Sequence, residues 1–172
     1  MVEHLLPTTS AFLEADVAAR IAHIRAPRWI GHPGASAAHV AMQQLLERPS
    51  SLRPRGLLLA GPYHNGKTMI AERFAVEHLR RVDRQRVWVI QTREGAGLSH
   101  FYASILSGLR APQAAGWRSL SRASEQVDHL LDSLKPRLLI FDEFHSALRG
   151  RRQDVKAIFS FLRRIARVHD IS

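Results

Sequence analysis

The segment Gly61-Pro-Tyr-His-Asn-Gly-Lys-Thr68 constrains the possible folds of this chain more than any other. It places two glycines, a lysine and a threonine at fixed spacing, after the apolar run Gly56-Leu-Leu-Leu-Ala60 and before a helical pattern over 67–82. A short apolar run of this kind is typical of a buried parallel strand. The order strand, glycine-bearing loop, helix is that of a P-loop, in which backbone amides point inward at phosphate oxygens.

Each fixed position of this loop has a chemical reason. Gly61 and Gly66 would let the backbone turn tightly. Lys67 would reach the β- and γ-phosphates of a nucleotide, and the Thr68 hydroxyl would ligate Mg²⁺. The positive end of the following helix would face the same phosphates. A chance glycine turn before a helix gives the same bare pattern, so the assignment depends on the flanking strand and helix. The loop residues predicted to hold the nucleotide are Gly61, Pro62, Tyr63, His64, Asn65, Gly66, Lys67, Thr68 and Met69.

A second apolar run, Leu138-Leu-Ile-Phe-Asp-Glu143, ends in two carboxylates. Because ligands bind at the carboxyl ends of the strands in open α/β folds, we expect Asp142 to hold Mg²⁺ beside Thr68. Glu143 would orient and polarise an attacking water. Acidic residues at a strand end are otherwise often a solvated turn. Together with the loop they predict an ATPase in which Lys67 and Glu143 are the catalytic residues.

Strand and helix patterns alternate along the rest of the chain. Helical spacing occurs over 10–25, 36–47, 67–82, 99–109, 121–134 and 153–168, and strand patterns occur over 56–60, 86–91 and 137–142. A capping serine with Glu125 nearby is expected to open the helix over 121–134. The alternation predicts an α/β fold with a parallel sheet and right-handed crossovers. We expect a single domain, with a helical entry segment over 1–50 and a nucleotide-binding core over 51–172.

Basic residues are numerous, since the net charge is +10, and most of them are arginines. Arginine suits bidentate phosphate contacts, which is compatible with nucleic-acid binding. A GC-rich genome would give the same bias. Placement favours DNA contacts at Arg149, Arg151 and Arg152 in the loop after Glu143. Further basic residues follow along the next helix (Lys156, Arg163, Arg164 and Arg167), where an ordinary solvated helix face is the alternative interpretation.

Several classes of protein are not expected. The absence of cysteine excludes disulfides, thiolate zinc sites and cysteine nucleophiles. The amino terminus lacks a basic region followed by an apolar one, and no apolar run approaches the roughly 20 residues of a transmembrane helix. We therefore expect a soluble cytoplasmic protein with no membrane partner. The ten histidines show no metal-binding spacing. His145 could lie near the γ-phosphate, although a packed or turn histidine is the default interpretation.

Several segments together resemble the TniB family, the AAA+ ATP-binding partners of transposases, over about residues 20–172. The most specific blocks are Asn65-Gly-Lys-Thr-Met-Ile70 and Asp142-Glu-Phe-His145. The other segments are Arg25-Ala-Pro-Arg-Trp-Ile-Gly-His-Pro33, Phe101-Tyr-Ala-Ser-Ile-Leu106, the remainder of 56–70 and 138–150, and Phe159-Ser-Phe-Leu-Arg163.

The resemblance implies a three-layer P-loop NTPase fold of the AAA+ type, with Ile30 and Gly31 against the adenine. It implies ATP and Mg²⁺ as cofactors, assembly on double-stranded DNA as a ring or filament of identical subunits, recruitment of a transposase, and release on hydrolysis. Two alternatives stay open. One is an AAA+ loader or remodelling ATPase that acts on a protein partner, and the other is a truncated paralogue that modulates full-length subunits.

The resemblance also implies a core that is incomplete at its carboxyl end, through a truncated reading frame or an excerpt. In related ATPases, the strand after the Asp-Glu pair inserts between the strands that carry the loop and the carboxylates. Here the sequence reaches Asp170-Ile-Ser172 where that strand would begin. Sensor 1, the arginine finger and the helical lid would then be missing, and turnover by this chain alone would be weak. We expect an open slot between 57–60 and 137–141, with unpaired strand edges and exposed apolar side chains.

Overall fold

The computed structural model describes residues 7–26, 28–50, 53–81, 84–95, 97–111 and 119–172. The chain divides into two compact units, Met1–His32 and Pro33–Ser172. The predicted division of the domain near residue 50 remains a prediction.

The first unit contains two short helices, α1 (Pro7–Ser10) and α2 (Val17–Arg25). The predicted single helix over 10–25 is therefore wrong. Asp16 starts α2 as its N-cap, because its side-chain Oδ1 accepts a hydrogen bond from the Ala19 N–H at 2.7 Å. Aspartate favours such cap positions over helix interiors, so the chain turns before it and begins a new helix after it.

The second unit contains the remaining helices and both strands, and each of them except the 3₁₀ helix η1, which was not predicted, lies within three residues of its predicted range. They are α3 (Pro33–Glu47), α4 (Lys67–Leu79), β1 (Val87–Gln91), α5 (Leu98–Gly108), α6 (Leu120–Leu134), β2 (Leu138–Asp142), the 3₁₀ helix η1 (Phe144–Arg149) and α7 (Arg152–Val168). The cap of α6 is Ser119, whose hydroxyl accepts the Arg122 N–H at 3.4 Å. The predicted pairing of a capping serine with Glu125 is wrong, because the cap lies too far upstream.

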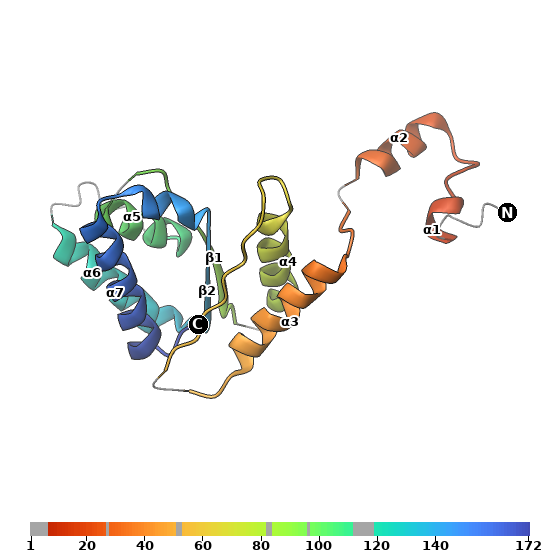
Figure 1. Ribbon diagram of the computed structural model, residues 1–172. Coiled ribbons are helices and arrows are strands. Elements are labelled where there is room, and N and C mark those ends of the chain that lie inside the picture. The colour runs from red at the N-terminus through yellow and green to blue at the C-terminus, as the bar shows by residue number, and fades with distance from the viewer. Residues whose placement is uncertain (1–6, 27, 51–52, 82–83, 96, 112–118) are drawn as a thin grey trace. The chain divides into compact units, whose positions relative to one another are not determined.

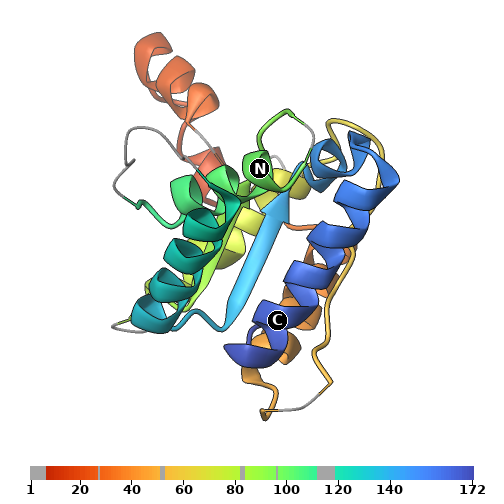
Figure 2. The same cartoon turned by 90° about the vertical axis from the view of Figure 1, so that its left-hand side faces the viewer.

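Strands β1 and β2 pair in parallel, in a register that runs from Val87 beside Leu138 to Gln91 beside Asp142. Figure 1 shows the sheet edge-on, with α4 on one side and α5, α6 and α7 on the other; Figure 2 shows the same layers after a quarter turn. The structure confirms an α/β class with a parallel sheet. The carboxyl ends of both strands meet at one edge of this sheet.

The predicted strand over 56–60 is wrong. Residues 54–60 have no regular secondary structure, and the Leu58 side chain is 84% exposed. On the edge of β2 that faces away from β1, two hydrogen bonds of 3.0 Å go to the carboxyl-terminal residue: Ser172 N–H donates to Arg137 O, and Leu139 N–H donates to Ser172 O. A short apolar run forms a strand only where a neighbour offers a ladder of hydrogen bonds, and within the described ranges 56–60 has none. The open slot expected beside this segment remains a prediction.

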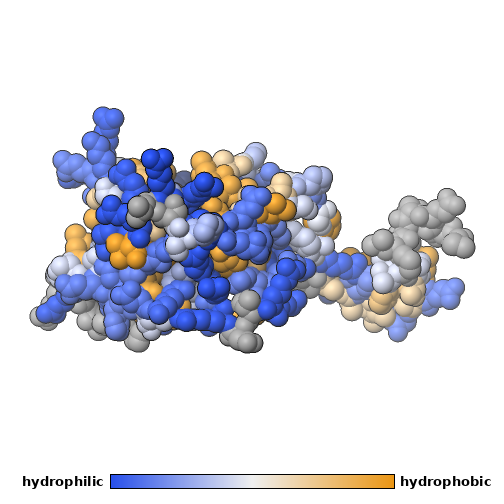
Figure 3. Space-filling model, turned by 90° about the horizontal axis from the view of Figure 1, so that it is seen from below, coloured by the Kyte–Doolittle hydropathy of each residue, from blue (hydrophilic) through white to orange (hydrophobic). Residues whose placement is uncertain are grey.

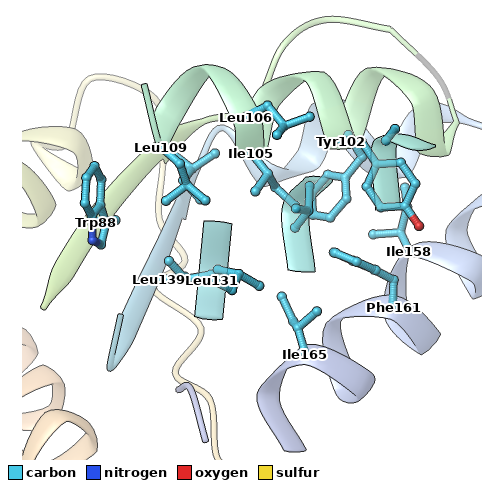
Figure 4. Close-up of a cluster of buried hydrophobic side chains, with 14 of the residues drawn as sticks. Trp88, Tyr102, Ile105, Leu106, Leu109, Leu131, Leu139, Ile158, Phe161 and Ile165 are labelled. Carbon is cyan, nitrogen blue, oxygen red and sulfur yellow. The ribbon is translucent and has the colours of Figure 1, made fainter. Parts of the chain in front are cut away.

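The core of the second unit lies between the sheet and helices α5, α6 and α7, as Figure 4 shows. Ile90, Ile105, Val127 and Ile158 are fully buried. Burial of each such side chain contributes about 1.5–3 kcal/mol to the free energy of folding. Aromatic rings extend this core toward the carboxyl end of β2, where Phe101 packs 5.3 Å from Phe141 between ring centroids.

The surface carries the polar and charged residues that give the chain its net charge of +10. The face seen in Figure 3 is largely hydrophilic, with smaller apolar patches. Among the helices of the described ranges, none is both long and apolar enough to cross a membrane.

Candidate phosphate-binding site

The loop before α4 turns through two left-handed residues, His64 at φ +58° and Gly66 at φ +73°. Gly66 is the N-cap of α4, and as a glycine it offers no side-chain hydrogen bond to the first turn of that helix. The leading amides of α4 therefore have no acceptor from their N-cap side chain, and the positive end of the helix is suited to an anion. Gly61 differs, since a Cβ there would meet only Asn65 Nδ2 at 3.6 Å, an ordinary contact. The folded chain by itself needs glycine at 66 and not at 61.

The Lys67 ammonium lies across its own loop. Its Nζ donates to Gly61 O at 3.0 Å and to Pro62 O at 2.7 Å. These carbonyls satisfy two of the three ammonium donors. A phosphate entering the loop would be a stronger, charged acceptor and would compete with both carbonyls for Lys67.

The two predicted Mg²⁺ ligands are in direct contact. The Thr68 hydroxyl donates to Asp142 Oδ2 at 2.8 Å, and the Glu143 N–H donates to Asp142 Oδ1 at 2.9 Å. The fold thus joins the start of α4 to the end of β2, which lie far apart in the sequence. A hydroxyl and a carboxylate oxygen side by side are hard ligands of the kind that Mg²⁺ prefers. Their role as ligands remains a prediction.

A tight turn follows Asp142. Glu143 has φ +51° and ψ +34°, the left-handed region, and starts η1. Its carboxylate Oε2 lies 3.2 Å from Nδ1 of His145, two residues further along the chain. The His145 ring in turn meets the Tyr63 ring edge-on, at 6.2 Å between centroids.

His145 lies in η1 directly after the turn, in agreement with the default interpretation of a turn histidine, while its contacts with Glu143 and Tyr63 were not foreseen from sequence. The available signal was the order acid, aromatic, histidine after a buried strand. Phe144 packs against the core aromatic rings at 6.1 Å from both Phe101 and Phe141. The residues on either side of Phe144 are therefore free to meet away from the core.

The other residues that were predicted to contact the nucleotide are exposed. Pro62, Asn65 and Met69 are exposed on the surface of the second unit. Ile30 and Gly31 belong to the first unit, where Ile30 is exposed. Their contact with adenine remains a prediction.

The predicted DNA contacts Arg149, Arg151 and Arg152 are all exposed. Arg149 is in the last turn of η1, while Arg151 is the N-cap of α7 and Arg152 its first residue. Further along α7, the predicted basic residues divide into two groups. Arg164 is engaged within the protein, at 3.0 Å from Asp128 Oδ1 and 3.3 Å from Ser124 Oγ. The others face solvent: Lys156, Arg163 and Arg167.

A polar cluster at the opposite end of β2 was not foreseen from sequence. Ser50 and Arg137 both donate to Asp170 Oδ2, and Arg48 Nη1 lies 3.3 Å from Asp170 Oδ1. The Ser50 hydrogen bond, and then Arg137 and Arg48, lower the pKa of the Asp170 carboxyl, against an opposing effect of burial. Arg48 also donates to Ser172 Oγ at 2.6 Å. The partners are so distant in sequence that no local pattern signals the cluster.

Comparison with known families decides what kind of chain carries this site. A family model described as "Bacterial TniB protein" matches residues 20–172. The chain belongs to the TniB family. The matched region of this TniB chain contains both the loop at 61–68 and the carboxylates at the end of β2, and membership associates the chain with transposition. No curated protein matches the sequence.

Proposed function

We propose that this TniB protein is an AAA+ P-loop ATPase that binds ATP with Mg²⁺, and that the nucleotide controls its assembly on double-stranded DNA and its recruitment of a transposase. The observation that carries the proposal is the 2.8 Å contact between Thr68 Oγ1 and Asp142 Oδ2, beside a helix start whose N-cap is a glycine. This contact puts a hydroxyl from the loop and a carboxylate from the sheet at one place. An ordinary glycine turn before a helix has no need of such a partner.

The residues at this site fit a nucleoside triphosphate with its metal ion. The loop amides and Lys67 would hold the phosphates, and Thr68 with Asp142 would hold Mg²⁺. When bound, the metal supplies positive charge that neutralises the charge developing on the phosphoryl oxygens.

The catalytic part of the proposal depends on Glu143. Its side chain is 40% exposed, which leaves it accessible to water. As an acceptor it would orient the attacking water and polarise its O–H bond. Transfer of the γ-phosphoryl group to that water gives ADP and inorganic phosphate. We expect slow turnover, because the chain's own residues at this site supply phosphate binding and one water-orienting carboxylate.

The DNA part of the proposal depends on the start of α7. Arg151 and Arg152 stand at the positive end of the helix macrodipole, where a cation typically costs about 0.3–1 kcal/mol of helix stability. Helix stability therefore does not explain them. Exposed guanidinium groups that face solvent are suited to bidentate contacts with phosphates of the DNA backbone.

Titration with a fluorescent ATP analogue in the presence of Mg²⁺ tests the nucleotide site. Lys67→Ala removes the cation of the loop, and we expect affinity to fall at least about tenfold, the effect of one charged hydrogen bond. Lys156→Ala removes an equal charge from the exposed face of α7 and serves as the matched control, with affinity unchanged. Equal affinities of the wild type and the Lys67→Ala protein would refute the nucleotide site.

A further inference from the structure

We infer that His145 is a positioning residue that holds the Glu143 carboxylate in its working orientation and links it to the phosphate loop through Tyr63. The inference rests on the proposed function, since it assigns His145 a part in the reaction at that site. The observations are the 3.2 Å distance from His145 Nδ1 to Glu143 Oε2 and the edge-on contact of the His145 and Tyr63 rings.

The backbone around Glu143 is fixed by the fold, while its side chain is partly exposed to solvent. The left-handed turn at Glu143 is closed by a hydrogen bond of 2.9 Å from Ser146 N–H to Glu143 O, and Ser146 and Ala147 are buried behind it. The Glu143 side chain, in contrast, is 40% exposed. Ordering a flexible glutamate costs up to about 1.5–2 kcal/mol of rotamer entropy. A donor that already engages the carboxylate in the folded protein removes part of that cost before water and substrate arrive.

His145 is the side chain that lies in place to supply such a donor, at ion-pair distance. In the described part of the chain, the side chain that meets the Glu143 carboxylate is His145, through Nδ1. A carboxylate only accepts hydrogen bonds, so a hydrogen bond across this 3.2 Å contact would place the proton of the neutral ring on Nδ1 and leave Nε2 bare. The Nδ1–H tautomer of His145 is therefore the sign that the pair forms. A histidine that merely packs in a turn has no reason to adopt it.

Tyr63 connects this pair to the phosphate loop. Its ring meets His145 at an interplanar angle of 87°, the geometry favoured by aromatic pairs. Tyr63 follows Pro62, whose carbonyl now accepts from Lys67 Nζ. A phosphate that draws Lys67 away frees that carbonyl and lets the loop beside Tyr63 adjust. Through the ring contact, binding of a phosphate in the loop then changes the position of the His145 ring and, with it, that of the Glu143 carboxylate.

Nitrogen-15 NMR of the histidine rings at about pH 8 tests the pair without any nucleotide. The His145 signals are assigned by their loss in His145→Asn. We expect the Nδ1–H tautomer in the wild type, a shift toward Nε2–H in Glu143→Ala, and no change in Glu72→Ala, which removes an exposed glutamate from α4. An Nε2–H ring that is indifferent to Glu143→Ala would overturn the inference.

The link to the loop is tested on the same signals with a non-hydrolysable Mg-ATP analogue. The expected result is a change in the His145 signals that is reduced in Tyr63→Ala. A saturating analogue that leaves these signals unchanged would overturn the link. If the wild type binds no analogue at all, the proposed function fails. The comparison with Glu143→Ala, which needs no nucleotide, still tests the contact between His145 and Glu143.

Turnover at saturating Mg-ATP gives the matching functional readout. His145→Ala should lower kcat by about 10- to 100-fold with KM nearly unchanged, because the carboxylate is then misplaced. His145→Asn should restore most of the rate, because its amide nitrogen can donate from near the Nδ1 position. An equal decrease of kcat in both variants, or a rise in KM with kcat unchanged, would contradict positioning.

Discussion

The residues of the loop differ in whether the fold itself requires them or only a bound ligand would. Gly66 is required by the backbone, since its φ of +73° lies in the region that residues with a Cβ avoid. Gly61 shows no such requirement, and an approaching phosphate would explain it better than the fold does. Lys67 and Thr68 already have protein partners, which a ligand must replace. The sequence singled out these residues, and their role in nucleotide binding remains a prediction. Their present hydrogen bonds could be found only from the structure.

Gly66→Ala should cost about 1–2 kcal/mol of unfolding free energy, the penalty of a left-handed alanine. No atom lies within 4 Å of the added Cβ, so the effect is conformational and not a clash. Urea unfolding measures it, with Gly56→Ala as the control. Gly56 also has open space around it, has no positive φ, and should change stability by less than about 0.5 kcal/mol. Equal effects of the two substitutions would show that the loop is not held left-handed at residue 66.

At the scale of elements, strand β2 makes polar contacts at both of its ends. Its carboxyl end delivers Asp142 and Glu143 to the loop, and its amino end joins the Asp170 cluster through Arg137. Period-2 and period-3.6 patterns predicted these strands and helices well, because their apolar faces are buried locally. They failed at 56–60, where forming a strand depends on a neighbouring strand that no local pattern encodes. The single helix over 10–25 failed for a different reason: Asp16 satisfies amides of a new helix start.

Asp170→Asn should destabilise the second unit at neutral pH. The substitution removes the negative charge that faces Arg48 and Arg137, and Arg48 is only 9% exposed. We expect a decrease of about 1.5–3 kcal/mol in the free energy of unfolding, the range for hydrogen bonds to charged groups. Urea unfolding at pH 7 measures the decrease, and Glu72→Gln on the exposed face of α4 is the control with no expected effect.

The pH dependence of this difference has a definite sign. The pKa of Asp170 is lower in the folded chain than its ordinary value of 3.8, chiefly through the Ser50 hydrogen bond. Its stabilising contribution is therefore complete above pH 3.8 and is lost as the pH falls through the lower, folded value. The gap in stability between the wild type and Asp170→Asn should shrink in acid. A gap that widens in acid would contradict the assignment.

Replacing Arg151 and Arg152 with glutamine should weaken DNA binding and leave the helix intact or slightly more stable, since two cations leave its positive end. Removing each arginine that binds a phosphate should lower the slope of log affinity against log salt by about one. Fluorescence anisotropy of a labelled duplex across a salt series measures both effects. Arg80→Gln with Arg122→Gln, both at exposed positions, removes the same charge elsewhere. If this control weakens binding equally, the interaction is general charge attraction and does not depend on the start of α7.

For the whole molecule, the sequence alone predicted the α/β class, the parallel sheet and the TniB family. It also predicted that residues of the loop and of the second strand would meet, as Thr68 and Asp142 do. These features follow from the periodic spacing of apolar residues and from motifs in which several residues have a fixed spacing. What could not be predicted arises from contacts between distant single residues, such as Asp170 with Ser50 and Arg137, or His145 with Tyr63. In the proposed switch, nucleotide bound at the loop controls DNA binding at the basic surface around the start of α7.

The most direct test of that switch is binding of a labelled double-stranded DNA near physiological salt, with and without Mg-ATP, for the wild type and Lys67→Ala. We predict that tight binding requires ATP and is abolished in Lys67→Ala at any ATP concentration. DNA binding of equal strength in all four conditions would contradict the switch and reduce the arginines to general attraction for phosphate.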